Sequence, residues 1–136
     1  MKPDRVLTIN GYFDEPILGV AELQGVPHIY EAEFDRTKDE YGGRYFLSPI
    51  DPELLALVLE ASAIWLRWNA AYLKKEVSLA SHPALPHERK RHEELTEAIG
   101  DPLTTDPANR KYFKAKFSNS PPDAEWAGTL VQWHPQ

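Results

Sequence analysis

Residues 51–75 read DPELLALVLEASAIWLRWNAAYLKK and contain the longest helical pattern in the chain. Asp51 can accept hydrogen bonds from backbone amides that have no partner at a helix start. Pro52 has the φ angle of a first helical turn, and Glu53 favours the positive end of the helix dipole. These three residues predict that a long helix begins here.

Charged side chains recur every seven residues along this helix and therefore fall on one side of it. They are Glu53, Glu60, Arg67 and Lys74. Apolar residues, with Trp65 and Trp68 among them, occupy most of the remaining circumference. An arc this wide predicts a helix that is covered on two sides, by a sheet and by other helices or a second subunit. Each buried aromatic or aliphatic side chain contributes about 1.5 to 3 kcal/mol, so this helix is expected to dominate the core.

The residues before the helix are expected to form an antiparallel meander of four strands. The predicted strands cover residues 6–12, 19–23, 26–34 and 44–47. The second and third flank Gln24-Gly25, which predicts a hairpin with a two-residue turn. Such a turn pairs Leu23 with Val26, Ala21 with His28, and Gly19 with Tyr30. Alternation then places His28, Tyr30 and Phe34 on the core face of the third strand.

Two further helices and one strand are expected after the long helix. The first covers residues 86–99, with Gly100 in the terminating position. Asp106-Pro107 repeats the pattern of Asp51-Pro52 and predicts a third helix that runs to about Phe117. Residues 128–134 are expected to return as a last strand.

The predicted fold is α+β, in a single domain over residues 1–136. It comprises a β-meander (1–49), a helical segment (51–117) and a C-terminal strand (128–134), in the order β-β-β-β-α-α-α-β. We expect about five strands in a curved antiparallel sheet packed on the long central helix. An SH3-like barrel with helices inserted before its last strand is the alternative.

Composition limits the class of protein. The chain has 136 residues, no cysteine and a net charge of −6. The absence of cysteine excludes disulfides and thiolate metal sites and fits a reducing compartment, so a cytoplasmic location is expected. Neither a signal peptide nor a membrane span is expected, because charge interrupts the longest apolar run.

No short motif of catalysis or of nucleotide binding occurs in the chain, and no catalytic residue, cofactor or metal is predicted. His87 and His92 lie in the segment HERKRHEE, which is not the HExxH zinc motif. Their spacing separates them by about 140° around a helix, so they do not point at one ion. Together with His82 they are expected to be solvated surface residues.

The negative charge is concentrated in the N-terminal part of the chain. Residues 1–60 hold twelve Asp and Glu against five Lys and Arg, a net −7, whereas residues 61–136 hold nine against ten, a net +1. Our first hypothesis is a non-enzymatic interaction module, similar to inhibitor or immunity proteins, that binds a basic protein partner through Glu22, Glu31, Glu33 and Asp35. Other acids in this region are Asp14, Glu15, Asp39 and Glu40, and a solvated sheet face is the alternative interpretation of all eight.

A second hypothesis is a small-molecule binder or enzyme with a pocket between sheet and central helix. The pocket would be lined by His28, Tyr30, Trp65 and Trp68. His28 would then transfer protons, whereas the alternative is a structural histidine bonded to a backbone carbonyl. A homodimer through the long helix or a free strand edge is a third possibility.

Nucleic-acid binding is expected to be unlikely. Basic residues gather at 89–91 and 110–116, and aromatics interleave with the second group. On a helix, however, that aromatic spacing is typical of a core stripe, the chain as a whole is acidic, and no known recognition motif occurs.

Overall fold

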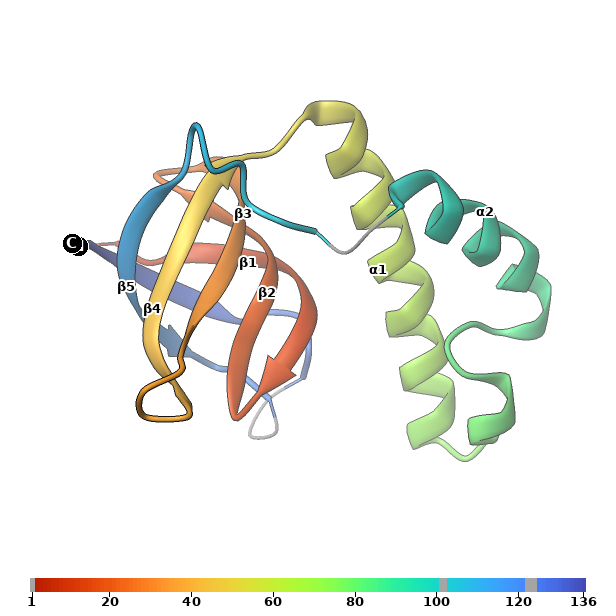
Figure 1. Ribbon diagram of the computed structural model, residues 1–136. Coiled ribbons are helices and arrows are strands. Elements are labelled where there is room, and N and C mark those ends of the chain that lie inside the picture. The colour runs from red at the N-terminus through yellow and green to blue at the C-terminus, as the bar shows by residue number, and fades with distance from the viewer. Residues whose placement is uncertain (1, 101–102, 122–124) are drawn as a thin grey trace. The chain divides into compact units, whose positions relative to one another are not determined.

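Six antiparallel strands close into a barrel in which each strand pairs with the next and β6 pairs with β1 (Figure 1). The computed structural model describes residues 2–100, 103–121 and 125–136. The strands are β1 (Asp4–Phe13), β2 (Glu15–Leu23), β3 (Val26–Asp35), β4 (Glu40–Pro49), β5 (Lys111–Ser118) and β6 (Leu130–Pro135). The helices α1 (Pro52–Leu73) and α2 (Arg89–Ile99), with the short 3-10 turns η1 (Leu79–Ser81) and η2 (Pro86–Glu88), come between β4 and β5.

The chain divides into two compact units. Residues up to 51 and from 103 onward form one, which we call the barrel, and residues 52–102 form the other, the helical unit. The α+β class is therefore confirmed, but the barrel is closed and has six strands where about five were expected in a sheet packed on the long helix. The alternative prediction, a barrel with helices inserted, is closer, although the insertion precedes the last two strands.

The β2–β3 hairpin has the predicted register. Leu23 pairs with Val26, Ala21 with His28, and Gly19 with Tyr30. Both turn residues, at positions 24 and 25, have positive φ angles of 52° and 82°, as a two-residue turn of this twist requires. Local turn chemistry thus determines this part of the sheet.

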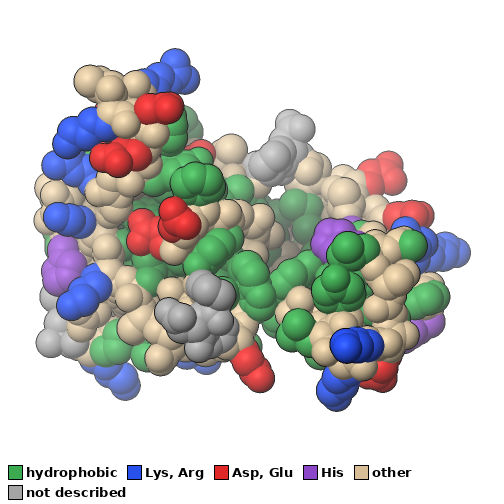
Figure 2. All heavy atoms as spheres, turned by 90° about the horizontal axis from the view of Figure 1, so that it is seen from below, with side chains coloured by type: hydrophobic (Ala, Val, Ile, Leu, Met, Phe, Trp, Pro, Cys, Tyr) green, Lys and Arg blue, Asp and Glu red, His purple; other side chains and the backbone are tan. Residues whose placement is uncertain are grey.

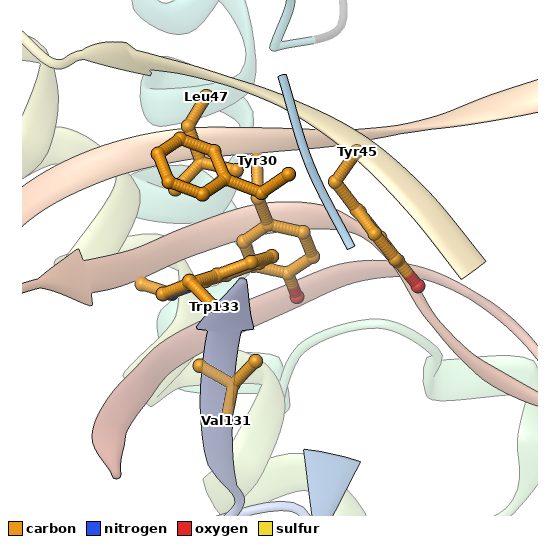
Figure 3. Close-up of a cluster of buried hydrophobic side chains, with 7 residues drawn as sticks. Tyr30, Tyr45, Leu47, Val131 and Trp133 are labelled. Carbon is orange, nitrogen blue, oxygen red and sulfur yellow. The ribbon is translucent and has the colours of Figure 1, made fainter. Parts of the chain in front are cut away.

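The core of the barrel is a cluster of aromatic side chains (Figure 3). Its buried members are Ala21, Tyr30, Tyr45, Leu47, Phe113, Val131 and Trp133. The rings of Tyr30, Tyr45 and Trp133 lie 5.6 to 6.1 Å apart and meet at angles, as aromatic pairs prefer. This cluster contains no residue of α1, so the prediction that the long helix dominates the core is wrong.

The polar tips of these aromatic side chains have partners. The Tyr30 hydroxyl donates to the Thr8 carbonyl oxygen at 2.9 Å, and the Trp133 indole N–H donates to the Glu22 carbonyl oxygen at 3.1 Å. A buried polar group without a partner would cost about 1 to 3 kcal/mol. The core therefore tolerates hydroxyl and indole groups because the strand backbones accept their hydrogen bonds.

The long helix itself is confirmed, because α1 spans Pro52–Leu73. Among its described residues, only Val58, Ile64 and Trp68 are buried, and Leu73 is 72% exposed. The expectation of nearly complete burial is therefore wrong.

Contacts within the helical unit are made between α1 and the segment that follows it. Ile64 packs with Ala84 and with Leu95 of α2. The charged stripe of α1 also meets this segment: Arg91 donates to the Glu60 carboxylate at 2.6 and 2.7 Å, and Arg67 donates to the Glu88 carboxylate at 2.9 and 2.5 Å. The stripe predicted to face water is thus partly used to hold the two helices together. The second predicted helix is confirmed as η2 and α2, and Gly100 follows it with φ 76°.

The third predicted helix is wrong, because most of its residues belong to the strand β5, which begins at Lys111. Asp106 does act as a cap, but of a turn: its carboxylate accepts from the backbone N–H of Ala108 at 3.0 Å and from the side chain of Asn109 at 2.9 Å. Phe113, Ala115 and Phe117 alternate toward the core, which is the period of a strand. Capping chemistry alone does not distinguish a turn from a helix start.

Gly19 lies where three strands come close together. A Cβ atom at this position would lie 2.3 Å from the Thr8 carbonyl oxygen and 2.7 Å from the Tyr30 hydroxyl oxygen. The Tyr30 hydroxyl donates to the same Thr8 oxygen, so neither atom can move without breaking a buried hydrogen bond. The barrel therefore requires glycine here.

We predict that Gly19→Ala lowers the free energy of unfolding by about 1 to 3 kcal/mol, because overpacking against backbone forces the strands apart. Urea unfolding followed by circular dichroism measures the change. Gly42→Ala is the matched control, since a Cβ there has nothing within 4 Å, and it should change stability by less than about 0.5 kcal/mol. Equal losses in the two variants would contradict this account.

We also predict that the barrel folds without the helical unit. Replacing residues 52–102 by a flexible Gly/Ser linker removes no residue of the aromatic cluster, and Leu47 and Lys111 pair across β4 and β5 close to the two cut points. Near-ultraviolet circular dichroism of the shortened chain should keep the signal of its packed tyrosines and Trp133, with a cooperative urea transition. Loss of both would show that the barrel core needs the helices.

Candidate functional site

The predicted acidic residues lie on β2 and β3 and have partners within the barrel. Arg5 donates to the Glu22 carboxylate at 2.5 Å, and only 9% of Glu22 is exposed. The Glu31 carboxylate accepts from the hydroxyl of Thr105 at 2.7 Å and from its backbone N–H at 3.3 Å. These two acids fix strands and a loop, so their carboxylates are already engaged.

The other two predicted acids are also engaged. The Tyr112 hydroxyl donates to the Glu33 carboxylate at 2.5 Å. Asp35 accepts from the backbone N–H groups of Thr37 and Lys38 at 2.9 and 3.1 Å, and so closes the turn after β3. A partner that used either acid would compete with one of these bonds.

The four residues of the predicted pocket are divided between the two units. Tyr30 is completely buried in the aromatic cluster of the barrel. The His28 ring nitrogen Nδ1 lies 2.7 Å from the Val26 carbonyl oxygen, which is the arrangement expected of a structural histidine. Trp65 and Trp68 belong to α1 in the helical unit. Neither unit by itself brings the four side chains together.

Trp68 and the histidines have local roles in the helical unit. The Trp68 indole donates to the Ser81 hydroxyl at 2.9 Å, and its ring stacks on Tyr72 at 5.0 Å. His82 meets the same indole edge-on at 4.6 Å. Within residues 2–100, 103–121 and 125–136, no group of three His, Cys, Asp or Glu side chains could hold a metal ion. By length and composition α1 could cross a membrane, but the core helices of soluble proteins meet the same criterion.

A different group of residues gathers where β1 meets β2 and where β3 meets β4. We call it the acidic–aromatic end; it comprises Phe13, Asp14, Glu15, Phe34, Asp35, Asp39, Glu40 and Tyr41. The rings of Phe34 and Tyr41 lie 5.0 Å apart at 72°, and those of Phe13 and Tyr41 lie 5.9 Å apart at 51°. Figure 2 looks onto this end of the barrel and shows hydrophobic and acidic side chains side by side.

Two tight turns place these side chains. Asp14 has φ 62° between β1 and β2, and Asp39 has φ 55° between β3 and β4, a conformation that Asp tolerates better than most residues. Phe34 and Tyr41 face each other across β3 and β4. Because the strands end here, the aromatic rings extend beyond the packed interior of the barrel.

Exposure and charge distinguish this end from an ordinary turn. Phe13 is 62% exposed and Phe34 is 43% exposed, although both rings are large and apolar. Five carboxylates lie at this end against the two cations Arg36 and Lys38. Exposed aromatic groups that lie next to each other are typical of interaction sites.

Glu15 is a partly buried acid of this end, and its environment favours the protonated form. Burial raises the pKa of Glu15 above its ordinary value of 4.5, a hydrogen bond from the Tyr45 hydroxyl lowers it in part, and the charge of Asp14 raises it further. The Tyr45 hydroxyl lies 3.3 Å from the Glu15 carboxylate and also donates to the Pro16 carbonyl oxygen at 2.5 Å. Burial raises the pKa of Tyr45 well above its ordinary range, so the phenol remains a donor at neutral pH.

The sequence signal for this end is the position of its aromatic residues. They lie on both sides of the β3–β4 turn and directly before the β1–β2 turn. Phe34 was expected in the core, because alternation places it on the face of Tyr30. The strand pairing changes register between Ala32 and Phe34, and Phe34 lies beyond the end of the packed interior.

We predict that Glu15→Gln changes how stability depends on pH. The folded chain holds the Glu15 proton more tightly than the unfolded chain, so the stability contributed by this group falls as the pH rises from below 4.5 through the raised pKa. Glutamine removes this titration and can still accept from the Tyr45 hydroxyl. Urea unfolding at pH 4 to 7 should show the wild type losing stability relative to the variant as the pH rises. The same trend in the exposed control Glu40→Gln would contradict burial as the cause.

Comparison of the chain with models of protein families, with curated proteins and with solved structures gave no match. What the chain does is therefore inferred from its own side chains. The acidic–aromatic end is the candidate site that these side chains support best.

Proposed function

We propose that this protein is a non-enzymatic interaction domain that binds a basic segment of a partner protein at the acidic–aromatic end. The observation that carries the proposal is the exposure of Phe13 and Phe34, whose rings both contact Tyr41, beside the exposed carboxylates of Asp14, Asp39 and Glu40. The absence of cysteine supports action in the cytoplasm.

Aromatic faces and carboxylates attract the same kind of ligand. A Lys or Arg side chain over an exposed ring gains about 0.5 to 1 kcal/mol from the cation–π interaction, and nearby carboxylates add Coulomb attraction. The apolar stem of the same side chain can cover the ring. A segment that combines Lys or Arg with aliphatic residues therefore complements this end in both charge and polarity.

The location of the site differs from that of the first hypothesis, although the chemistry of the partner is the same. Glu22, Glu31 and Glu33 hold partners within the barrel, which leaves them less available to a ligand. Asp14, Asp39 and Glu40, in contrast, are exposed. Binding at the end of the barrel would not break the bonds that fix the strands.

The alternative of a small-molecule binder or enzyme has less support. Its pocket would need Tyr30 and His28 from the barrel together with Trp65 and Trp68 from the helical unit. Tyr30 is completely buried among other rings and donates to the Thr8 carbonyl oxygen.

We predict that the variant Phe13→Ala/Phe34→Ala binds a basic peptide about tenfold more weakly than the wild type, since each lost cation–π contact is worth about 0.5 to 1 kcal/mol. The probe is a fluorescein-labelled peptide of twelve residues made of lysine, arginine and leucine, and fluorescence anisotropy measures its binding. Asp14→Asn/Glu40→Gln should weaken binding at low salt and have less effect at high salt.

Leu73→Ala/Leu79→Ala is the matched control for these variants. Both leucines are exposed, at 72% and 65%, and both belong to the helical unit. This control should bind the peptide as the wild type does. The proposal fails if the control and the Phe13→Ala/Phe34→Ala variant weaken binding equally, or if neither weakens it.

A further inference from the structure

The strand β5 divides its side chains between the inside and the outside of the barrel. Phe113 is buried in the aromatic cluster, and Ala115 and Phe117 pack against it. Alternation therefore directs Tyr112, Lys114 and Lys116 outward, and both lysines are exposed. A helix would have distributed these residues around its circumference, whereas the strand aligns them in one row.

The neighbouring strand β4 adds positive charge to this row, because Arg44 pairs with Lys114. On the other side, Lys114 pairs with His134 of β6. Like charges directly opposite each other on a sheet destabilise it. The three ion pairs that the described residues make within 4 Å, Arg5–Glu22, Arg67–Glu88 and Arg91–Glu60, include neither Arg44 nor the β5 lysines. The Tyr112 hydroxyl donates to Glu33 and also interacts with Arg44, so one carboxylate borders the row. Lys114 and Lys116 remain exposed cations that an anionic ligand would neutralise.

Aromatic rings lie in the same surface. Phe46 pairs with Tyr112 across β4 and β5, and the two rings are 5.1 Å apart at 32°. The Arg110 guanidinium lies 3.9 Å from the centre of the Phe46 ring. Both rings are only partly buried. We call this surface the basic face; it comprises Arg44, Phe46, Arg110, Tyr112, Lys114, Lys116 and His134. In Figure 2, Lys and Arg side chains line the edge of the barrel on the left.

We propose that the basic face binds single-stranded nucleic acid. Outward residues two apart on a strand are separated by roughly 6.6 Å and neighbouring strands by about 4.8 Å, so the cations form a track for an extended phosphate backbone. Tyr112 and the Arg110 guanidinium are planar groups on which unpaired bases can stack. An acidic peptide could use the cations but would gain nothing from the planar groups. The proposal does not depend on the function of the acidic–aromatic end.

The expectation against nucleic acid rests on the acidic character of the chain, on the lack of a known recognition motif, and on residues 110–116 as a helix with a core stripe. The strand moves Phe113 inside and leaves the lysines and Tyr112 outside, so the last of these three arguments no longer applies. The net charge of the chain is still −6. Binding of nucleic acid therefore depends on the gathering of cations on one face and not on the charge of the whole chain. Binding is therefore expected to be modest and strongly dependent on salt.

The first test compares charge reversal at two places. Binding of fluorescein-labelled dT12 is measured by fluorescence anisotropy at 50 mM salt and above. Lys114→Glu/Lys116→Glu should weaken binding at least tenfold and reduce the slope of log K against log salt by about 1.4, the value for two phosphate contacts on a single strand. Lys74→Glu/Lys75→Glu changes the net charge equally in the helical unit and should weaken binding less than threefold. Equal effects in the two variants would overturn the proposal.

The second test asks whether bases are recognised in addition to charge. Tyr112→Ala should weaken dT12 binding about tenfold, since one stacked base contributes about 1 to 3 kcal/mol, whereas Tyr112→Phe keeps the ring and should bind as the wild type does. A polyglutamate peptide of equal charge should compete poorly. Equal competition by polyglutamate would show a general polyanion surface and overturn the nucleic-acid assignment.

Folding of the variants is checked separately. Tyr112→Phe and Tyr112→Ala both lose the hydrogen bond to Glu33, so this bond does not explain a difference between them. Lys114→Gln/Lys116→Gln removes the charges without adding new ones, and it replaces the Glu variant if urea unfolding shows that the latter is not folded. Wild-type affinity in a folded Gln variant would also overturn the proposal.

Discussion

Closure of the sheet is the constraint on which the rest of the barrel depends. When β6 pairs with β1, side chains on the inner face of each strand must share one enclosed volume. Tyr30, Tyr45, Phe113 and Trp133 fill it with rings that meet at angles, and strand carbonyls accept the hydrogen bonds of the buried hydroxyl and indole groups. Gly19 is needed because Thr8 and Tyr30 meet over it. The helices are not required to provide this core.

The same alternation that fills the interior also determines what lies outside. Tyr112, Lys114 and Lys116 form a row because their neighbours in the sequence are inside the barrel. At the ends of the strands, aromatic side chains lie outside the packed interior. Phe13 and Phe34 are therefore exposed to solvent next to acidic residues. The barrel thus carries two surfaces of opposite charge, and aromatic rings accompany the charge in both. The two proposals concern ligands of opposite sign and can be tested independently.

Carboxylates also hold elements of the chain together, so an acidic composition does not by itself indicate a binding face. Glu22 and Glu31 bind Arg5 and Thr105, and in the helical unit Glu60 and Glu88 bind arginines. Exposed ion pairs of this kind contribute little to stability, because solvent screens them. They nevertheless occupy carboxylates that a count of charges would assign to a binding face.

Local chemistry was sufficient where neighbouring residues decide the structure. The turn at Gln24-Gly25, the start of α1 at Pro52 and the end of α2 before Gly100 were all predictable, because each depends on the φ preferences or hydrogen-bonding groups of a few consecutive residues. Asp106-Pro107 carried the same signal as Asp51-Pro52, yet it begins a turn, since the strand that follows gains more by closing the barrel. Which carboxylates were already engaged, and which rings remained exposed, depended on residues far away in the sequence. Only the tertiary structure decided these points, because it alone brings Arg5 to Glu22, Thr105 to Glu31 and Phe13 to Tyr41.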